Sequence, residues 1–311
     1  MIYAYLDWNV FDRIEKKDNL DAKQRDTFSK IEQLIIDKKI VLPYSNAHIN
    51  DLLRGHANNP TYIPKHLETL SRLTQNLRIV QYWGNAQTTW HYRGVNEFFN
   101  SALNNKDITS KPFTELLDFD EAQLNQLKAI PVPNNFKEIY KASPMFNFMF
   151  PRTKIEMNLL AMCEDLYDFS NNANRDYSLY KSLRSYVNQI YAKLKNQKML
   201  KEINKATNDV PVYLNMDDAW EQYVPKTKTS DNPAYQKITD TYLRIDFKGY
   251  KSDERFANMI DDSLHVFYGA YCDYFITIDD KCHYKAVETY HKLGIETKAL
   301  KPNEFIGIVT N

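Results

Sequence analysis

Residues 2–7 read IYAYLD, and this short stretch indicates the fold class. Five apolar, β-prone residues followed by an acid are typical of a buried strand that carries a carboxylate at its C-terminal end. Residues 22–37 then show apolar side chains at helical spacing, and 38–45 (KKIVLPYS) contain a second β-prone run. The sequence therefore predicts a strand–helix–strand unit, with Asp7 at the edge where open α/β sheets bind ligands.

The same alternation continues for a short distance and then stops. The segment from Asn46 and residues 63–75 predict two helices, and 77–83 (LRIVQYW) predicts a third strand. Between about 95 and 245 the pattern becomes helical and irregular, with prolines in polar connections.

An α/β pattern returns near the end of the sequence. Residues 255–270 (RFANMIDDSLHVFYGA) predict a helix. The segments after it, YFITI, KAVETYHKLG and IETKAL, predict a strand, a helix and a strand. We therefore expect a three-layer α/β domain with a mostly parallel sheet, formed by 1–94 and 246–311. A mainly helical insertion, 95–245, is expected to interrupt it.

The composition excludes several classes of protein. A chain of 311 residues that is 43% hydrophobic can bury a large core, and 40 basic against 40 acidic residues leave no overall excess charge. The three cysteines fit neither a disulfide framework nor a zinc ribbon, and the seven glycines form no phosphate-binding loop. No signal-peptide pattern or run of about 20 apolar residues is present, so we expect a cytoplasmic protein without a membrane partner.

Four aspartates follow or occupy the predicted elements of the α/β half. Asp7 follows the first strand, Asp51 lies on the helix after the second, Asp262 is expected to open a late helix, and Asp279 follows a late strand. Mg²⁺ and Mn²⁺ prefer carboxylate oxygens, so converging aspartates predict a divalent-metal site. Each acid alone has another explanation, as a cap, a turn residue or a solvated helix residue.

Three stretches, together with the closing strand, resemble the PIN-domain family of metal-dependent ribonucleases, in particular PIN-like proteins with long insertions. They are YLDWNVF (5–11), YSNAHINDLLR (44–54) and DDSLHVFYGAYCDYFITIDDK (261–281). The resemblance implies a PIN-like fold over about 1–83 and 250–311. It also implies that the four aspartates hold Mg²⁺ or Mn²⁺ and act in catalysis, with Asn9 and Thr277 as supporting polar groups.

Several neighbours of the four acids are further candidates. Asp261 and Asp280 make the last two assignments ambiguous by one residue. His48 and His265 lie three residues from Asp51 and Asp262, so on helices they would share a face with them, either to bind the carboxylate or phosphate or as satisfied core histidines. Ser45 precedes a helix, where it either caps the N-terminus or orients a carboxylate or water.

One helical pattern within the insertion suggests contact with nucleic acid. In residues 177–198, aromatic and basic side chains share one face of the expected helix, beside an apolar stripe. Rings that stack on bases and cations that bind phosphate would suit RNA, although a solvated amphipathic helix explains the same pattern. The five residues are Tyr180, Arg184, Tyr191, Lys195 and Lys198.

These observations predict a metal-dependent endonuclease that acts on single-stranded or structured RNA in preference to DNA. A toxin or anti-phage role, with an inhibitory or activating protein partner, is compatible with the resemblance. A metal-dependent phosphatase is an alternative, but that chemistry usually needs Asp-x-Asp, and Asn9 stands at the second position. A PIN-like scaffold or partner-binding module without catalysis is the other alternative.

Overall fold

The structure is a computed structural model, and it divides the chain into two compact units. Unit 1 contains Met1–Asn104, Val224–Asp253 and Asn258–Asn311, and unit 2 contains Asn105–Tyr223 and Glu254–Ala257. The residues that the structure describes are 1–82, 88–104, 113–116, 119–132, 147, 149–173, 182, 185, 233–247, 251 and 256–310.

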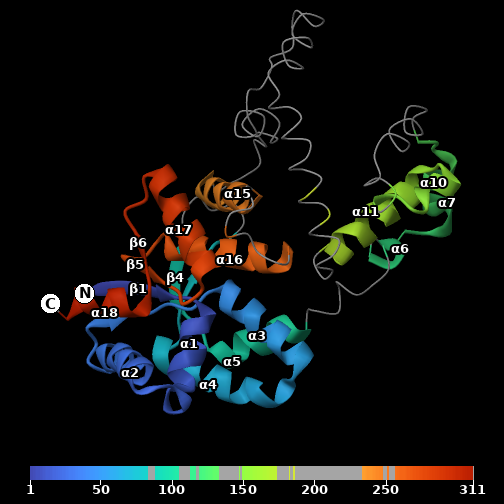
Figure 1. Ribbon diagram of the computed structural model, residues 1–311. Helices are drawn as coiled ribbons and strands as arrows, with labels where there is room; N and C mark the ends of the chain where they lie inside the picture. The colour runs from blue at the N-terminus through green and yellow to red at the C-terminus, as the bar shows by residue number, and fades with distance from the viewer. Residues whose placement is uncertain are drawn as a thin grey trace, which may run out of the picture. The chain divides into compact units, whose positions relative to one another are not determined.

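Unit 1 contains a parallel sheet of four strands in the order β2-β1-β5-β6 (Figure 1). Register pairs Ile2 with Ile40, Ala4 with Tyr274, and Phe275 with Ala299. The expected mostly parallel α/β sheet is therefore confirmed. Its strands are β1 (Ile2–Leu6), β2 (Ile40–Val41), β5 (Tyr274–Ile276) and β6 (Lys298–Leu300).

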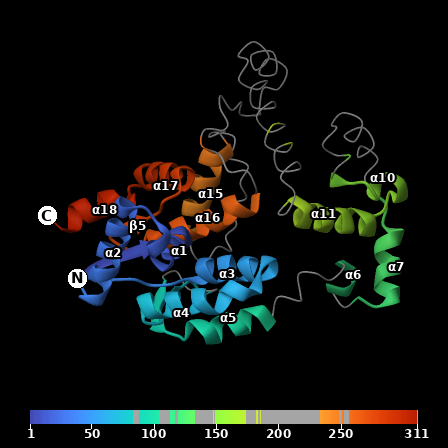
Figure 2. The ribbon, with the colours of Figure 1, turned by 60° about the horizontal axis from the view of Figure 1, so that its bottom comes forward.

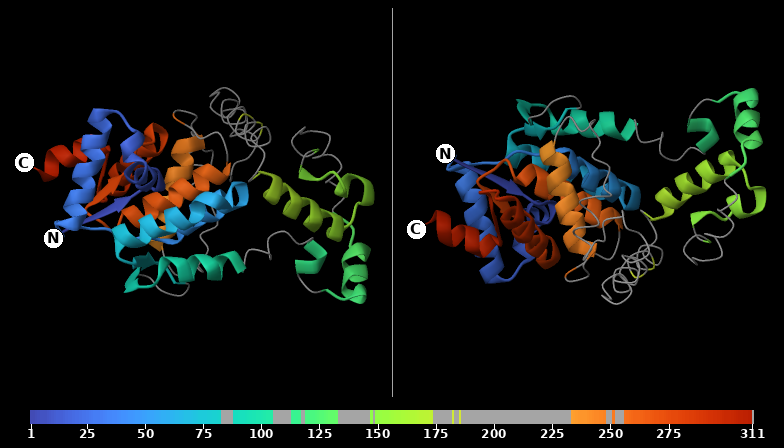
Figure 3. Two further views of the ribbon diagram at one scale, coloured as in Figure 1. Left: turned by 90° about the horizontal axis from the view of Figure 1, so that it is seen from below. Right: turned by 90° about the horizontal axis from the view of Figure 1, so that it is seen from above.

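Helices cover this sheet, and contacts divide them into two groups. Helices α1 to α5 pack on one another, whereas α15 packs on α17, and in Figure 1 the strands lie between these groups. The two chain ends lie on the same side of unit 1 (Figures 2 and 3). The helices are α1 (Trp8–Glu15), α2 (Ala22–Ile36), α3 (Asn46–Asn58), α4 (Ile63–Thr74), α5 (Val95–Asn104), α15 (Pro233–Phe247), α16 (Phe256–Gly269), α17 (Asp280–Leu293) and α18 (Pro302–Val309), with short 3₁₀ turns at Lys17–Asn19 and Pro60–Tyr62.

Helix α2 shows why the periodic segments fold as they do. Asp21 caps its N-terminus by accepting a hydrogen bond from the Gln24 backbone N–H at 2.9 Å. Phe28 and Ile31 are among the side chains that this helix buries in the main core, as the helical spacing predicts. That core also includes Ala4 and Leu6, which lie on one face of β1, and Tyr5 on the opposite face is fully buried too, so both faces of the first strand are covered.

The expected third strand lies in a separate sheet. β3 (Leu77–Val80) pairs antiparallel with β4 (Thr89–Tyr92), a strand that the sequence pattern did not reveal. A parallel bridge between Tyr44 and Arg78 places β3 beside the segment that follows β2. The alternation of residues in β4 is weak because its side chains are all partly or fully exposed.

The compact units differ from the expected domain boundaries of 94 and 246. Helix α5 belongs to unit 1 because Val95 and Phe99 enter the main core. Helix α15, which was expected in the insertion, also belongs to unit 1, since Tyr242 and Ile245 are buried and the helix packs on α17.

The described part of unit 2 is helical, as expected for the insertion. Its helices are α6 (Phe113–Leu116), α7 (Glu121–Ala129), α10 (Thr153–Glu156) and α11 (Leu159–Ala173). Val132 and Phe150 form a small core with three methionines packed against it. Across the described ranges of both units, no helix has the length and apolar character required to cross a membrane.

Candidate active site

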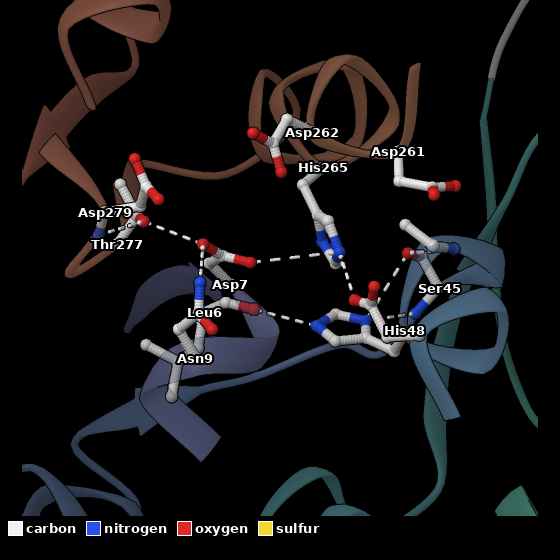
Figure 4. A network of polar contacts seen from close by, with 12 residues as sticks. Leu6, Asp7, Asn9, Ser45, His48, Asp261, Asp262, His265, Thr277 and Asp279 are labelled. Carbon is white, nitrogen blue, oxygen red and sulfur yellow. Dashed lines mark hydrogen bonds and ion pairs between the residues drawn. The ribbon is translucent and has the colours of Figure 1, made fainter. Parts of the chain in front are cut away.

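A pocket of about 390 Å³ lies at the carboxyl ends of β1 and β5. Parallel strands bring loops that are distant in sequence to this edge, which is why α/β sheets bind ligands there. Figure 4 shows the acidic side chains that meet around it. Eight residues line the pocket: Asp7, Trp8, Asn9, Asp51, Arg54, Asn258, Asp262 and Asp279. The four aspartates that the sequence singled out are therefore brought together.

Asp7 is the most deeply placed of these acids, with 3% of its surface exposed. Its backbone N–H continues the sheet ladder by donating to the Ile276 carbonyl at 2.9 Å. Thr277 Oγ1 donates to Asp7 Oδ2 at 2.7 Å, and Asn9 Nδ2 donates to the same oxygen at 3.3 Å (Figure 4). Burial raises the pKa of Asp7, and the neighbouring charges of Asp51 and Asp279 raise it further. The expected supporting residues thus both contact the first acid.

Asp279 is fixed by the start of α17. It is the N-cap of that helix, and its Oδ1 accepts from the backbone N–H groups of Lys281 at 2.6 Å and Cys282 at 2.9 Å. Its own N–H donates to Thr277 Oγ1 at 3.1 Å. One threonine hydroxyl therefore connects the backbone of Asp279 to the carboxylate of Asp7.

Asp51 is held by two donors from different helices. His265 Nε2 donates to Asp51 Oδ2 at 2.8 Å, and Arg54 Nη2 pairs with Asp51 Oδ1. Burial acts to raise the pKa of Asp51, but the hydrogen bond from His265 and the charges of His265 and Arg54 outweigh it, so the pKa is lowered. The pKa values of Asp51 and Asp7 are therefore shifted in opposite directions within one pocket.

Behind Asp51 lies a chain of buried polar groups. Tyr5 Oη is 2.9 Å from His265 Nδ1 and 2.6 Å from Ser45 Oγ. Ser45 caps α3, as one of the two sequence interpretations predicted, with its Oγ accepting from the Ala47 N–H at 3.1 Å. This chain determines how the ring of His265 is turned toward Asp51.

His48 is a satisfied core histidine. Its Nδ1 accepts from the Ser45 N–H at 3.0 Å and its Nε2 donates to the Leu6 carbonyl at 2.8 Å (Figure 4). Burial, with the nearby His265, lowers the pKa of His48 to about 3, so the ring stays neutral. His48 therefore joins α3 to β1 and does not bind Asp51. His265 also does not pair with the acid near it in sequence, Asp262, but donates to Asp51.

Asp262 lies inside α16 and does not open a helix, contrary to expectation. The helix begins at Phe256, because the apolar spacing that includes the fully buried Met259 extends to the N-terminal side of the acid. Tyr242 of α15 donates its hydroxyl to Asp262 Oδ2 at 3.4 Å. Helix α15 is anchored to α17 by a fully buried ion pair of 2.9 Å between Asp246 and Lys285.

The structure separates the two ambiguous neighbours from the pocket. Asp261 forms an ion pair of 2.8 Å with Arg54 and does not line the pocket. Asp280 has a side chain that is 78% exposed and pairs with Lys301 at 2.9 Å. Asp262 and Asp279 are therefore the pocket members of the two pairs.

The five candidate RNA-contact residues of the insertion, Tyr180, Arg184, Tyr191, Lys195 and Lys198, lie outside the described residues. Conversely, the pocket contains residues that sequence reasoning did not select. Arg54 stands three residues after Asp51 on α3, a spacing that already indicates a shared helix face. Trp8 directly follows Asp7, but no local signal marked Asn258, nor Tyr242, which contacts Asp262 without lining the pocket.

The donor set suits a hard divalent cation, although the ligands are not gathered around one point. Among the described residues, no group of three or more histidine, cysteine, aspartate or glutamate side chains is arranged to hold a metal ion. Mg²⁺ usually keeps several waters and binds through one or two carboxylates and substrate phosphates. A set of aspartates in one open pocket, with Asp7 buried and the other three partly exposed, meets that requirement.

Comparison of the chain with protein-family models, curated proteins and solved structures found no match. The residues of the pocket are therefore the basis on which a function is inferred.

Proposed function

We propose that this protein is a divalent-metal-dependent nuclease that hydrolyses phosphodiester bonds at the acidic pocket. The observation that carries this proposal is the meeting of Asp7, Asp51, Asp262 and Asp279 from four separate segments in one pocket. Clustered buried carboxylates destabilise a fold unless a cation compensates them, so a fold that gathers them indicates a site for one.

We further propose that unit 1 has a PIN-like fold. The acids occur in the order that the resemblance requires, one after the first strand, one on the following helix, one on a late helix and one after a late strand. An endoribonuclease is the activity that this resemblance favours. Trp8 supports a single-stranded nucleic acid as the substrate, because it lines the pocket and aromatic rings stack on unpaired bases; the preference for RNA comes from the resemblance alone.

The residues that would hold the ion include Asp7, Asp262 and Asp279. When bound, Mg²⁺ or Mn²⁺ supplies charge neutralisation for the phosphodiester and acidifies water near neutral pH. Thr277 and Asn9 keep the carboxylate of Asp7 in place, and the N-terminus of α17 orients Asp279. The protein thus provides a fixed set of oxygen ligands, with a ring for the base beside them.

The test is cleavage of labelled single-stranded RNA and DNA in Mn²⁺, Mg²⁺ or EDTA. Asp7→Asn and Asp262→Asn should each lower metal-dependent cleavage by at least about tenfold to a hundredfold, since loss of a group that supports a metal site typically costs that much. Asp26→Asn on the exposed face of α2 is the matched control and should cleave like wild type. Cleavage that persists in EDTA, or in both pocket variants, would contradict the proposal.

A scaffold without catalysis makes a different forecast for the same samples. It predicts neither cleavage nor any rise in melting temperature with Mn²⁺. A metal-dependent rise in wild type that is absent in Asp7→Asn would support the metal site even before a substrate is found.

A further inference from the structure

Arg54 has an unusual position for a side chain in an acidic pocket. Its Nη1 lies 2.8 Å from Asp261 Oδ2 and 3.5 Å from Asn258 Oδ1, and its Nη2 pairs with Asp51. The side chain is nevertheless 40% exposed. Among the described residues that line the pocket, Arg54 alone carries a positive charge.

The carboxylates of the pocket differ in how far their oxygens are already occupied. Both oxygens of Asp51 are taken, Oδ2 by His265 and Oδ1 by Arg54. In Asp7, by contrast, Thr277 and Asn9 both donate to Oδ2, and His265 Nε2 lies 3.9 Å from Oδ1, beyond hydrogen-bond distance. Asp279 likewise receives both of its backbone hydrogen bonds on Oδ1. Asp7 and Asp279 thus keep an oxygen available, and Asp51 does not.

We propose that Arg54, oriented by Asp51 and Asp261, contacts a phosphate of the substrate, and that Asp51 is a positioning residue and not a metal ligand. Asp7, Asp262 and Asp279 then hold a single ion, and the guanidinium neutralises charge where a second ion would otherwise be needed. This inference rests on the proposed nuclease function, and it assigns separate tasks to acids that the resemblance treats alike.

The chemistry of the side chain supports this division. A guanidinium has five N–H donors in a planar fork that matches phosphate oxygens, and its three acceptors in Asp51, Asp261 and Asn258 leave donors for a ligand. Asp261 lies on the opposite side of His265 from Asp279 (Figure 4), so Arg54 extends the pocket away from the Asp7–Asp279 end. A cation bound directly to Asp51 would have to share an oxygen that already accepts from Arg54 or His265, next to a charged guanidinium.

The first experiment measures Mn²⁺ binding to the full-length chain by titration calorimetry, without substrate. We expect one ion per chain in wild type and in Asp51→Asn, with dissociation constants within about threefold of each other. That difference in binding free energy is well under the roughly 1.4 kcal/mol of a tenfold change. Asp7→Asn should weaken binding by at least about tenfold. Two ions in wild type, or an equal loss in Asp51→Asn and Asp7→Asn, would overturn the inference.

The second experiment measures binding of a fluorescein-labelled single-stranded RNA by anisotropy, with Ca²⁺ as the oxygen-binding cation, at several salt concentrations. Arg54→Ala should weaken binding and reduce the slope of log affinity against log salt by about 0.7, the value for one phosphate contact on a single strand. Arg54→Lys should restore the slope but only part of the affinity, because an ammonium lacks the fork.

Arg72→Ala is the matched control, because Arg72 forms a comparable partly exposed ion pair, with Glu32 at 2.7 Å, outside the pocket. It should bind RNA like wild type. An Arg54→Ala variant with the melting temperature, affinity and salt slope of wild type would refute the phosphate contact. If wild type binds Mn²⁺ but cleaves no substrate, that result counts against the nuclease. The Mn²⁺ titration of the variants and the salt slope of RNA binding then still decide this inference. The absence of Mn²⁺ binding would count against both.

Discussion

His265 Nε2 donates a 2.8 Å hydrogen bond to Asp51 Oδ2, although the two residues are 214 positions apart in the chain. The bond joins α16 to α3 and, through Tyr5, to the central strand. His265 and Tyr5 are both almost wholly buried, so the loss of His265 would leave the Tyr5 hydroxyl without this partner in the interior. This contact is therefore a structural link as well as a part of the pocket.

Replacing His265 by alanine should destabilise unit 1 by about 1–3 kcal/mol, the usual cost of leaving buried polar partners unsatisfied. The measurement is urea denaturation followed by circular dichroism. His291→Ala, at an exposed position near the end of α17, provides the control and should change stability by less than about 0.5 kcal/mol. Equal losses in the two variants would show that the buried network is not important for stability.

Asp7→Asn should stabilise the metal-free protein at neutral pH, because it removes a desolvated charge while keeping an acceptor for Thr277. The pKa of Asp7 is raised in the folded state, so the folded protein holds its proton more tightly than the unfolded chain does. The penalty is thus complete above the folded pKa and disappears as pH falls below the unfolded value. Thermal melts in EDTA should show the gain of the variant shrinking toward acid pH; a gain that grows there would be contrary to this account.

The effect of Glu32 on stability should depend on pH in the opposite sense to that of Asp7. Burial acts to raise its pKa, but hydrogen bonds and charge from Lys17 and Arg72 outweigh it and lower the pKa. Its stabilising effect is present above the unfolded pKa and is lost as pH falls through the folded one. Glu32→Gln should cost about 0.5–1 kcal/mol at pH 7, since the partners are partly exposed, and less near pH 4. Asp26→Asn, which breaks the exposed pair with Lys30, should show no such dependence.

Two glycines near helix ends should respond oppositely to alanine. A Cβ at Gly269 would lie 2.8 Å from Phe275 Cδ2 and 2.8 Å from Tyr290 Oη, so Gly269→Ala should cost about 1–3 kcal/mol by overpacking. At Gly307 in α18 nothing lies within 4 Å, and alanine should be neutral or gain up to about 1 kcal/mol from helix propensity. Melting curves of the two variants measured in parallel test these expectations. A Gly269→Ala variant more stable than wild type would contradict the close packing around Gly269.

The sequence allowed prediction of those features that local patterns determine. The apolar run before Asp7 and the spacing of Phe28 and Ile31 predicted β1 and α2 where they occur. The acids were located because each stands at a recognisable point beside a periodic segment. The same local reasoning selected Ser45 as a possible cap, which it is.

Contacts between distant segments could not be read in this way. The sequence shows Asp262 and His265 as neighbours on one helix, but the fold pairs His265 with Asp51 instead. The role of α15 was equally hidden, because a helix of mixed composition joins one unit or another according to what it packs against, here α17. The three-residue spacing of Asp51 and Arg54 is visible in the sequence, whereas nothing in the sequence shows that Arg54 also contacts Asp261.

The order of the strands has a consequence for how the protein is made. β1, at Ile2–Leu6, has β5, at Tyr274–Ile276, as one of its two neighbours. During translation at about 5–20 residues per second, the first strand therefore waits on the order of tens of seconds for that partner. The pocket, which needs Asp7 and Asp279 together, cannot be complete before residue 279 has been synthesised and has left the ribosome.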